Sequence, residues 1–263
     1  MEQRDLEQYC CDTRTIVAET AEFIANELGK VGKGDIEVKA LNSLVSYVDK
    51  TAEERLVEGL RKLIPDSVFL TEEETISAQS GEYQWIIDPL DGTTNFLHQV
   101  PCFAVSVALR HRETTILGVV QEVNRKECFY ACRNGGAFLN GKKIQVSQTP
   151  LLKDSLIATG FPYYDFKKLA PYLKVLEYFM LNTRGIRRMG AAAVDLAYVA
   201  CGRFDTFFEY GLNAWDVAAG VSIVQEAGGK VFDFKGGENY LFGRELIATN
   251  PFLSEEVLKI ISL

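Results

Sequence analysis

Apolar residues recur at helical spacing in two stretches near the beginning of the chain. The first stretch covers residues 6–28 and is followed by Gly29, a common helix stop signal. The second begins after Asp49 and is ended by Pro65-Asp66. The pattern therefore predicts two amphipathic helices that each bury one face.

Residues 68 to about 146 show a different pattern, with short runs of β-branched and aromatic residues. The strands that it predicts are Val68–Leu70, Tyr83–Ile87, Phe103–Leu109, Ile116–Val123 and Cys128–Ala131. The alternation over residues 103–109 indicates antiparallel strands with one covered face. Asn134-Gly135 and Asn140-Gly141 are dipeptides of tight turns and close this region.

The second half of the chain alternates helical and strand patterns. The predicted helices are 166–181, 190–201, 214–227 and 252–262, and the predicted strands are 155–159, 204–208, 230–234 and 245–249. This rhythm is typical of α/β proteins built from layers of helices and sheets. We expect an N-terminal α+β half over residues 1–146 and a C-terminal α/β half over residues 147–263.

Composition and charge narrow the function classes. A chain of 263 residues that is 47% hydrophobic can bury a substantial core. Its 28 basic and 36 acidic residues give a net charge of -8, which disfavours nucleic acid as a partner. An anionic substrate would then need local neutralisation, which a bound divalent metal supplies.

No apolar run approaches the roughly 20 residues that span a bilayer, and the N-terminus lacks an apolar signal region. We therefore expect a cytoplasmic protein with no membrane partner.

A buried strand that ends in two acids is the main candidate for chemistry. Pro89 removes an amide donor and should stop the strand, and Asp88 and Asp91 flank it closely enough for their oxygens to converge on one cation. Gly92 lets the backbone approach a ligand, and the helix that Thr93 could open would offer amides to phosphate. An ordinary acidic turn between two strands is the alternative, but it does not account for the proline, the threonines and the further acids.

Two more acids lie in suggestive places. Glu72 follows the predicted strand that ends at Leu70, and Asp216 stands at the start of an otherwise apolar helix. A solvated acidic loop is the alternative for Glu72, and helix N-capping is the alternative for Asp216. Neither acid alone would indicate a metal site.

Taken together, these segments resemble the inositol monophosphatase family of magnesium-dependent, lithium-sensitive phosphatases. The resemblance spans nearly the whole chain and is most specific over residues 85–96 and 215–220. It implies a layered α-β-α-β-α sandwich of mixed α/β (α+β) class, like that of fructose-1,6-bisphosphatase, assembled as a homodimer. It also implies two or three Mg²⁺ ions as cofactors.

The resemblance also implies the roles of individual residues. The residues that match metal ligands are Glu72, Asp88, the Leu90 carbonyl, Asp91 and Asp216. Asp49 matches an aspartate that hydrogen-bonds the catalytic Thr93, and Lys39 matches a lysine near the same site. The residues that match substrate contacts are Gly92, Thr93, Asp91, Ala192, Glu209 and Asp216. The N-terminal half would thus carry most metal ligands, and the C-terminal half the polyol contacts and one ligand.

The chemistry of phosphate monoesters agrees with this assignment. The ester is a dianion that repels nucleophiles, so Mg²⁺ must screen its charge and activate water. We hypothesise that a water near Glu72 and Thr93, with Asp49 behind the threonine, attacks phosphorus in line. A second water near Asp91 and Asp216 would protonate the departing oxygen. The resemblance implies a small phosphorylated polyol as the substrate, with inositol 1-phosphate preferred.

Several alternatives remain open. Family members that hydrolyse 3'-phosphoadenosine nucleotides, fructose 1,6-bisphosphate, histidinol phosphate or NADP share the same core motif, although residues 158–162 and 209–211 look more like bacterial inositol monophosphatases. A haloacid-dehalogenase-type phosphatase has its two acids one residue closer together. Only His98 and His111 are present, and no cysteine has an arginine six residues later, which disfavours histidine and cysteine phosphatases. A regulatory or binding protein for RNA synthesis or ribosome assembly on the same fold is the alternative from another class.

Overall fold

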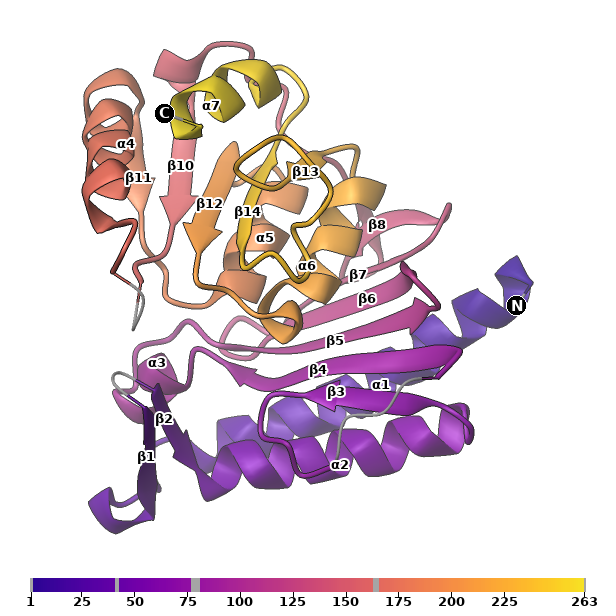
Figure 1. Cartoon of the computed structure of the whole chain (residues 1–263). Coiled ribbons are helices and arrows are strands. Elements are labelled where there is room, and N and C mark those ends of the chain that lie inside the picture. The colour runs from indigo at the N-terminus through magenta and orange to yellow at the C-terminus, as the bar shows by residue number, and fades with distance from the viewer. Residues whose placement is uncertain (1, 41–42, 77–80, 163–165, 263) are drawn as a thin grey trace.

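Five layers of helices and sheets make up the molecule. The computed structural model describes residues 2–40, 43–76, 81–162 and 166–262 (Figure 1). Three separate clusters of buried apolar side chains lie between successive layers. The predicted α-β-α-β-α sandwich of mixed α/β class is therefore confirmed.

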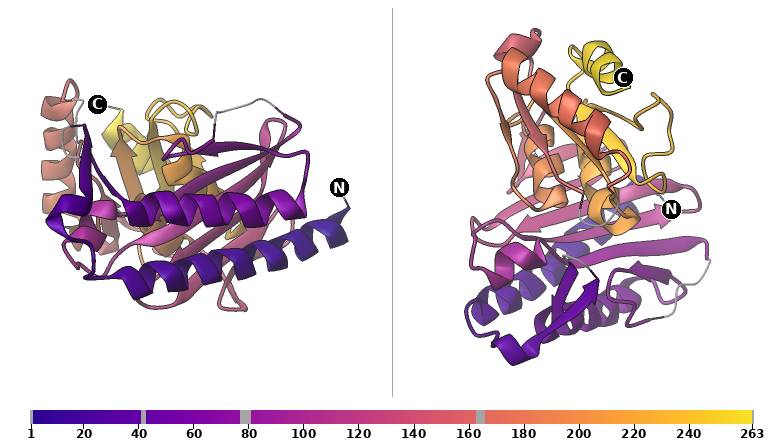
Figure 2. Two further views of the ribbon diagram at one scale, coloured as in Figure 1. Left: turned by 90° about the horizontal axis from the view of Figure 1, so that it is seen from below. Right: turned by 60° about the vertical axis from the view of Figure 1, so that its left-hand side comes forward.

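The first layer consists of two long helices, α1 (Gln3–Glu27) and α2 (Tyr47–Leu63). They run side by side beneath the first sheet (Figure 2, left). Each buries one apolar face against that sheet, as the helical spacing predicts.

The first sheet has seven strands in the order β3-β4-β5-β6-β7-β8-β9, of which only the β3–β4 pair is parallel. The strands are β3 (Val68–Thr71), β4 (Tyr83–Asp91), β5 (Ala104–His111), β6 (Thr114–Glu122), β7 (Glu127–Cys132), β8 (Gly136–Leu139) and β9 (Lys142–Ile144). Asn140-Gly141 forms the two-residue turn between β8 and β9, with both residues at positive φ, as expected for a tight hairpin.

The expectation that residues 103–109 have one covered face is wrong, because both faces are buried. Large side chains such as Val105 and Val107 pack on α1 and α2, whereas the small Ala104 and Ala108 face the middle helices. The period of two is real, but it separates large from small residues instead of buried from exposed ones. Small residues on this face let a helix approach the sheet closely.

Two buried helices form the middle layer, α5 (Ala192–Ala200) and α6 (Ala214–Glu226), and they pack on both sheets. The second sheet has the order β11-β10-β12-β14-β13. Its strands are β10 (Leu156–Thr159), β11 (Gly185–Arg187), β12 (Thr206–Tyr210), β13 (Lys230–Phe232) and β14 (Glu245–Thr249). The last layer contains α4 (Leu169–Asn182) and α7 (Ser254–Ile261), which cover its other face.

Several short elements were not predicted. They are β1 (Ile36–Ala40), β2 (Ser43–Ser46), α3 (Thr93–Leu97) beyond its first residues, β8, β9, β11 and two 3₁₀ turns at Lys33–Asp35 and Leu152–Asp154. Most have no apolar alternation of useful length and depend on pairing with a neighbour. Among these elements, the β1–β2 hairpin lies beside α3, the helix that begins at Thr93 (Figure 1).

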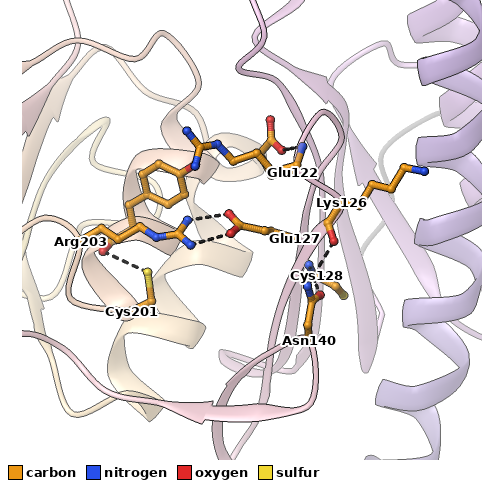
Figure 3. Close-up of polar contacts among 9 residues, drawn as sticks. Glu122, Lys126, Glu127, Cys128, Asn140, Cys201 and Arg203 are labelled. Carbon is orange, nitrogen blue, oxygen red and sulfur yellow. Dashed lines mark hydrogen bonds and ion pairs between the residues drawn. The ribbon is translucent and has the colours of Figure 1, made fainter.

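An ion pair connects the end of α5 to the first sheet. Arg203, just after α5, donates two hydrogen bonds of 2.6 Å to the carboxylate of Glu127 at the start of β7 (Figure 3). The same guanidinium lies 4.6 Å from the ring centroid of Tyr198. Asn140 accepts a 2.8 Å bond from the Cys128 amide and so steadies the neighbouring strand (Figure 3).

The chain passes from the first sheet to the second between β9 and β10, close to residue 146. The division into two halves at that point stays a prediction, because α5 and α6 share one core with both sheets. No helix in the described ranges is long and apolar enough to cross a bilayer.

Gly118 in β6 packs directly against the backbone of α6. A Cβ there would lie 2.6 Å from the Ala219 carbonyl oxygen and 3.0 Å from its Cα. We predict that Gly118→Ala lowers the free energy of unfolding by about 1–3 kcal/mol, because α6 must move away from the sheet. Thermal and urea unfolding measure the change. Gly34→Ala is the control, since a Cβ there meets open space, and equal stability of the two variants would contradict this packing.

Candidate active site

A cavity of about 320 Å³ opens where the two sheets and the middle helices meet. Nine residues singled out from the sequence line it: Glu72, Asp88, Leu90, Asp91, Gly92, Thr93, Ala192, Glu209 and Asp216. Asp49 is buried behind Thr93. Residues from position 49 to position 216 therefore form one site.

The turn that carries the two central acids is a bulge in β4. Asp88 pairs with Ser106 and Asp91 with Ala104, so β4 has one residue more than β5 in this interval. Asp88 also accepts a 3.0 Å bond from the Leu90 amide. The expectation that Pro89 stops the strand is thus wrong: the proline occupies the bulge, where no ladder bond is required, and pairing resumes at Asp91.

Three carboxylates converge at one end of the cavity. Ligand oxygens of Glu72, Asp88 and Asp216 all lie within 4.8 Å of one another. Asp88 is only 1% exposed, and burial together with the charge of Glu72 raises its pKa well above the ordinary range. Like charges this close need protons or a cation between them. A hard oxygen donor set of this kind fits Mg²⁺.

Asp216 combines two functions that the sequence presented as alternatives. One of its oxygens accepts a 2.7 Å bond from the Asn213 amide in the capping box at the start of α6. The residue also belongs to the carboxylate cluster. The cap fixes the direction of the side chain, and burial raises its pKa to about 7.

Asp91 is held by the beginning of α5. Its two oxygens accept bonds from the amides of Ala192 at 3.2 Å and Ala193 at 2.7 Å. Burial raises the pKa of Asp91 to about 7, although these bonds act in the opposite direction. The Ala192 amide, at a position that matches a substrate contact, donates to Asp91.

The Thr93 hydroxyl lies between Asp49 and the β4 bulge. It is 2.9 Å from Asp49 Oδ1 and 3.0 Å from the Leu90 carbonyl oxygen, and it donates its one proton to either. The other Asp49 oxygen accepts bonds from the amide and the hydroxyl of Ser46, both at 2.8 Å, in the cap of α2. Burial raises the pKa of Asp49. An oriented hydroxyl backed by a carboxyl group can hold a water and relay its proton.

Position 92 requires a glycine, both for its backbone conformation and for the space around it. Its φ is +90°, and an added Cβ would lie 3.1 Å from the Cys102 carbonyl oxygen and 3.2 Å from that of Gly190. The left-handed residue turns the chain from β4 into α3. The backbone at Gly92 and Thr93 is thereby presented to the cavity.

Glu209 and Arg188 also line the cavity. A Cβ on Gly160 would lie 1.9 Å from Glu209 Oε2, so the carboxylate occupies the space that the glycine leaves open. Burial and the charge of Asp216 raise the pKa of Glu209 well above the ordinary range, while Arg188 acts against this. A carboxyl and a guanidinium side by side suit the hydroxyl groups of a polyol.

Glu53 and Asp195 are among the buried acids that the sequence interpretation did not single out. Glu53 in α2 is 0% exposed and contacts the segment after Glu72. Asp195 in α5 is 1% exposed, and its Oδ1 has no hydrogen-bond partner among the described residues. Each is an acid on a helix face that is otherwise apolar, a pattern that marks burial but does not reveal the partners. The Lys39 side chain lies outside the described part of the structure.

Nearly the whole chain matches one protein family. The sequence profile of the inositol monophosphatase family matches residues 5–262. The chain belongs to the inositol monophosphatase family. The resemblance inferred from the motifs is confirmed.

Individual members of the inositol monophosphatase family are similar over most of their length. The chain is 46% identical over 225 residues to the putative Nus factor SuhB of Neisseria meningitidis serogroup B, covering 85% of this chain and 86% of that protein. It is 38% identical to the inositol-1-monophosphatase of Mesorhizobium japonicum, covering 90% of this chain and 89% of that protein. The solved structure of the extragenic suppressor protein suhB of Bartonella henselae superposes with a TM-score of 0.90 at 38% identity, over 94% of this chain and 95% of that chain. The fold is therefore that of the family.

The crowded carboxylates of this family member predict a pH dependence of stability. Asp91 and Asp216 have pKa values of about 7 in the folded protein, against about 4 in an unfolded chain. Between these values the folded state binds more protons, so the free energy of unfolding falls as the pH rises from about 4 to about 7. Protons also compete with a metal for these oxygens.

We therefore predict that saturating Mg²⁺ raises Tm by several degrees at about pH 8 and by much less at about pH 5. Thermal unfolding with and without Mg²⁺ measures the difference. Asp216→Asn should reduce the increase at the higher pH, whereas Asp66→Asn at an exposed position should leave it unchanged. An increase that is the same at both pH values would contradict the proton competition.

Proposed function

We propose that this protein is a Mg²⁺-dependent phosphate monoester hydrolase that acts on inositol 1-phosphate. The convergence of Glu72, Asp88 and Asp216 carries the proposal, because it provides hard oxygen donors beside the cavity. Membership of the inositol monophosphatase family supports the reaction class. The family relative named inositol-1-monophosphatase supports the substrate.

Mg²⁺ held by Glu72, Asp88, Asp216, Asp91 and the Leu90 carbonyl would neutralise the phosphate dianion and lower the pKa of a water. The chain itself supplies orientation and proton transfer. Thr93 accepts a hydrogen bond from the attacking water while its own proton points to Asp49. Backbone amides at Gly92 and Thr93, where α3 begins, receive the phosphate oxygens.

The substrate alcohol is oriented by Asp91 and by groups from the second half of the chain. Asp91 is fixed on two amides of α5 and so faces the leaving group in one orientation. Together with Asp216 it would direct a second water that protonates the departing oxygen. Glu209, Arg188 and the start of α5 meet the ring hydroxyls. Inhibition by Li⁺ belongs to the same proposal.

A second candidate function is a regulatory role in RNA synthesis or ribosome assembly. It is favoured by one observation, the name Nus factor SuhB carried by relatives that are 41–46% identical to the chain. The carboxylate cluster occurs in a chain that is this similar to proteins named Nus factor SuhB. A regulatory role would therefore be compatible with catalysis.

Homodimer formation is also part of the proposal. Leu173, Met180 and Leu181 on α4 are 50%, 58% and 78% exposed, and such side chains gain from burial between subunits. Sedimentation equilibrium distinguishes a dimer from a monomer.

A panel of phosphate monoesters tests the activity. We predict Mg²⁺-stimulated phosphate release that is fastest, by kcat/KM, with inositol 1-phosphate and slower with adenosine 3',5'-bisphosphate, fructose 1,6-bisphosphate, histidinol phosphate and NADP. Asp91→Asn should lower kcat by about 100-fold or more, because it removes a charge needed for proton transfer to the leaving group. Asp66→Asn is the matched control on the surface.

Different failures of this assay have different meanings. Wild-type turnover in Asp91→Asn would refute the assigned role of that residue. Efficient hydrolysis of nucleotides alone would replace the substrate. Absence of Mg²⁺-stimulated hydrolysis of every ester would favour the regulatory candidate.

A further inference from the structure

Helix α2 carries two buried carboxylates on the face that it turns toward the site. Asp49 and Glu53 are four residues apart, so they lie one above the other on that face. Asp49 contacts Thr93. Glu53 has no place in the mechanism described so far, although it is 0% exposed.

Glu53 uses both of its oxygens to hold residues 72–76, which we call the Glu72 loop. Its Oε2 accepts a 2.8 Å bond from the Glu73 amide. Its Oε1 accepts bonds from the Thr75 amide at 2.8 Å and from the Thr75 hydroxyl at 2.6 Å. Charge-assisted bonds of this kind are stronger than neutral ones, and three of them satisfy a carboxylate that is otherwise costly to bury.

These bonds restrain Glu72 on its C-terminal side, while the sheet restrains it on the other. The Glu72 amide donates to the Ile87 carbonyl of β4 at 3.3 Å, and the next amide in the chain donates to Glu53. The peptide groups on both sides of the Glu72 Cα are therefore fixed. They therefore fix the point on the backbone from which the Glu72 carboxylate reaches Asp88 and Asp216.

The Glu72 loop needs such a restraint, because it belongs to no helix or strand. Glu74 has a φ of +51°, in the left-handed region that a glutamate adopts only where contacts maintain it. Glu53 bonds the residues on either side of Glu74, Glu73 and Thr75.

We propose that Glu53 is the positioning residue of the metal ligand Glu72, and that α2 sets the separation of the two halves of the catalytic apparatus. Through Asp49 the helix fixes Thr93, and four residues later, through Glu53, it fixes Glu72. This inference rests on the proposed function, because it takes Glu72 as a Mg²⁺ ligand. It assigns Glu53 no contact with substrate or metal.

The test is Glu53→Gln, which keeps the shape of the side chain and replaces one acceptor oxygen with an NH₂ group. At least one of the amides of the Glu72 loop then loses its acceptor. We expect the Kd for Mg²⁺, measured by calorimetry without substrate, to rise about 10- to 100-fold. Hydrogen exchange of residues 72–76 in the metal-free protein should become faster, whereas kcat at saturating Mg²⁺ should recover to within about threefold of wild type.

Two further variants make the result specific. Glu54→Gln removes an exposed carboxylate from the next position of α2 and should change neither exchange nor Kd. Thr75→Val removes only the hydroxyl bond to Glu53 and should shift both in the same direction by a smaller factor. Adding it to Glu53→Gln should raise Kd by less than the product of the two single effects, because the variants share that bond.

Folded Glu53→Gln that binds Mg²⁺ with wild-type affinity, or that shows unchanged exchange in residues 72–76, would overturn the proposal. A loss of kcat with unchanged Kd would overturn it as well. If Glu53→Gln does not fold, Thr75→Val decides by the same criteria. Wild-type protein that binds Mg²⁺ but hydrolyses no ester would refute the proposed function alone, since Kd and exchange still report on Glu53.

Discussion

Repulsion between crowded carboxylates is the constraint on which the rest of the structure depends. Glu72, Asp88 and Asp216 hold oxygens within 4.8 Å of one another at a largely buried position, with Asp91 in the same cavity. The unfolded chain would keep such charges apart in water. The packing energy of the fold must therefore offset the cost of bringing these charges together. The fold must also hold each carboxylate in one orientation.

The layered architecture meets this requirement from several sides. The bulge of β4 carries both Asp88 and Asp91. Asp88 belongs to the carboxylate cluster, whereas Asp91 accepts hydrogen bonds from the amides of α5. Helix α6 brings in Asp216 through its capping box, and its close approach depends on the small residues of β5 and β6. Helix α2 supports Thr93 and the Glu72 loop from behind. Asp88, Asp91 and Asp216 are thus each positioned by bonds from main-chain amides.

The sequence was sufficient for the layers, the family and nine of the residues that line the cavity. Long periodic stretches such as α1 and α2 are predictable because one face must be apolar. The bulge at Pro89 was not, because a proline looks the same at the end of a strand and in the middle of a bulged one. The covered second face of β5 was missed because Ala104 and Ala108 are apolar but small. Glu53 was missed because its partners, Glu73 and Thr75, lie about twenty residues away and meet it only in the folded chain.

The central claim is that the three-carboxylate cluster holds the divalent cation on which the chemistry depends. A crystal structure of the protein crystallised with Mn²⁺ in place of Mg²⁺ tests this binding most directly. Manganese is located by its anomalous scattering, independently of the protein atoms. We predict an anomalous peak between Glu72, Asp88 and Asp216, with carboxylate oxygens at coordination distance. An empty cluster at saturating Mn²⁺, or an ion bound only elsewhere on the chain, would contradict the claim.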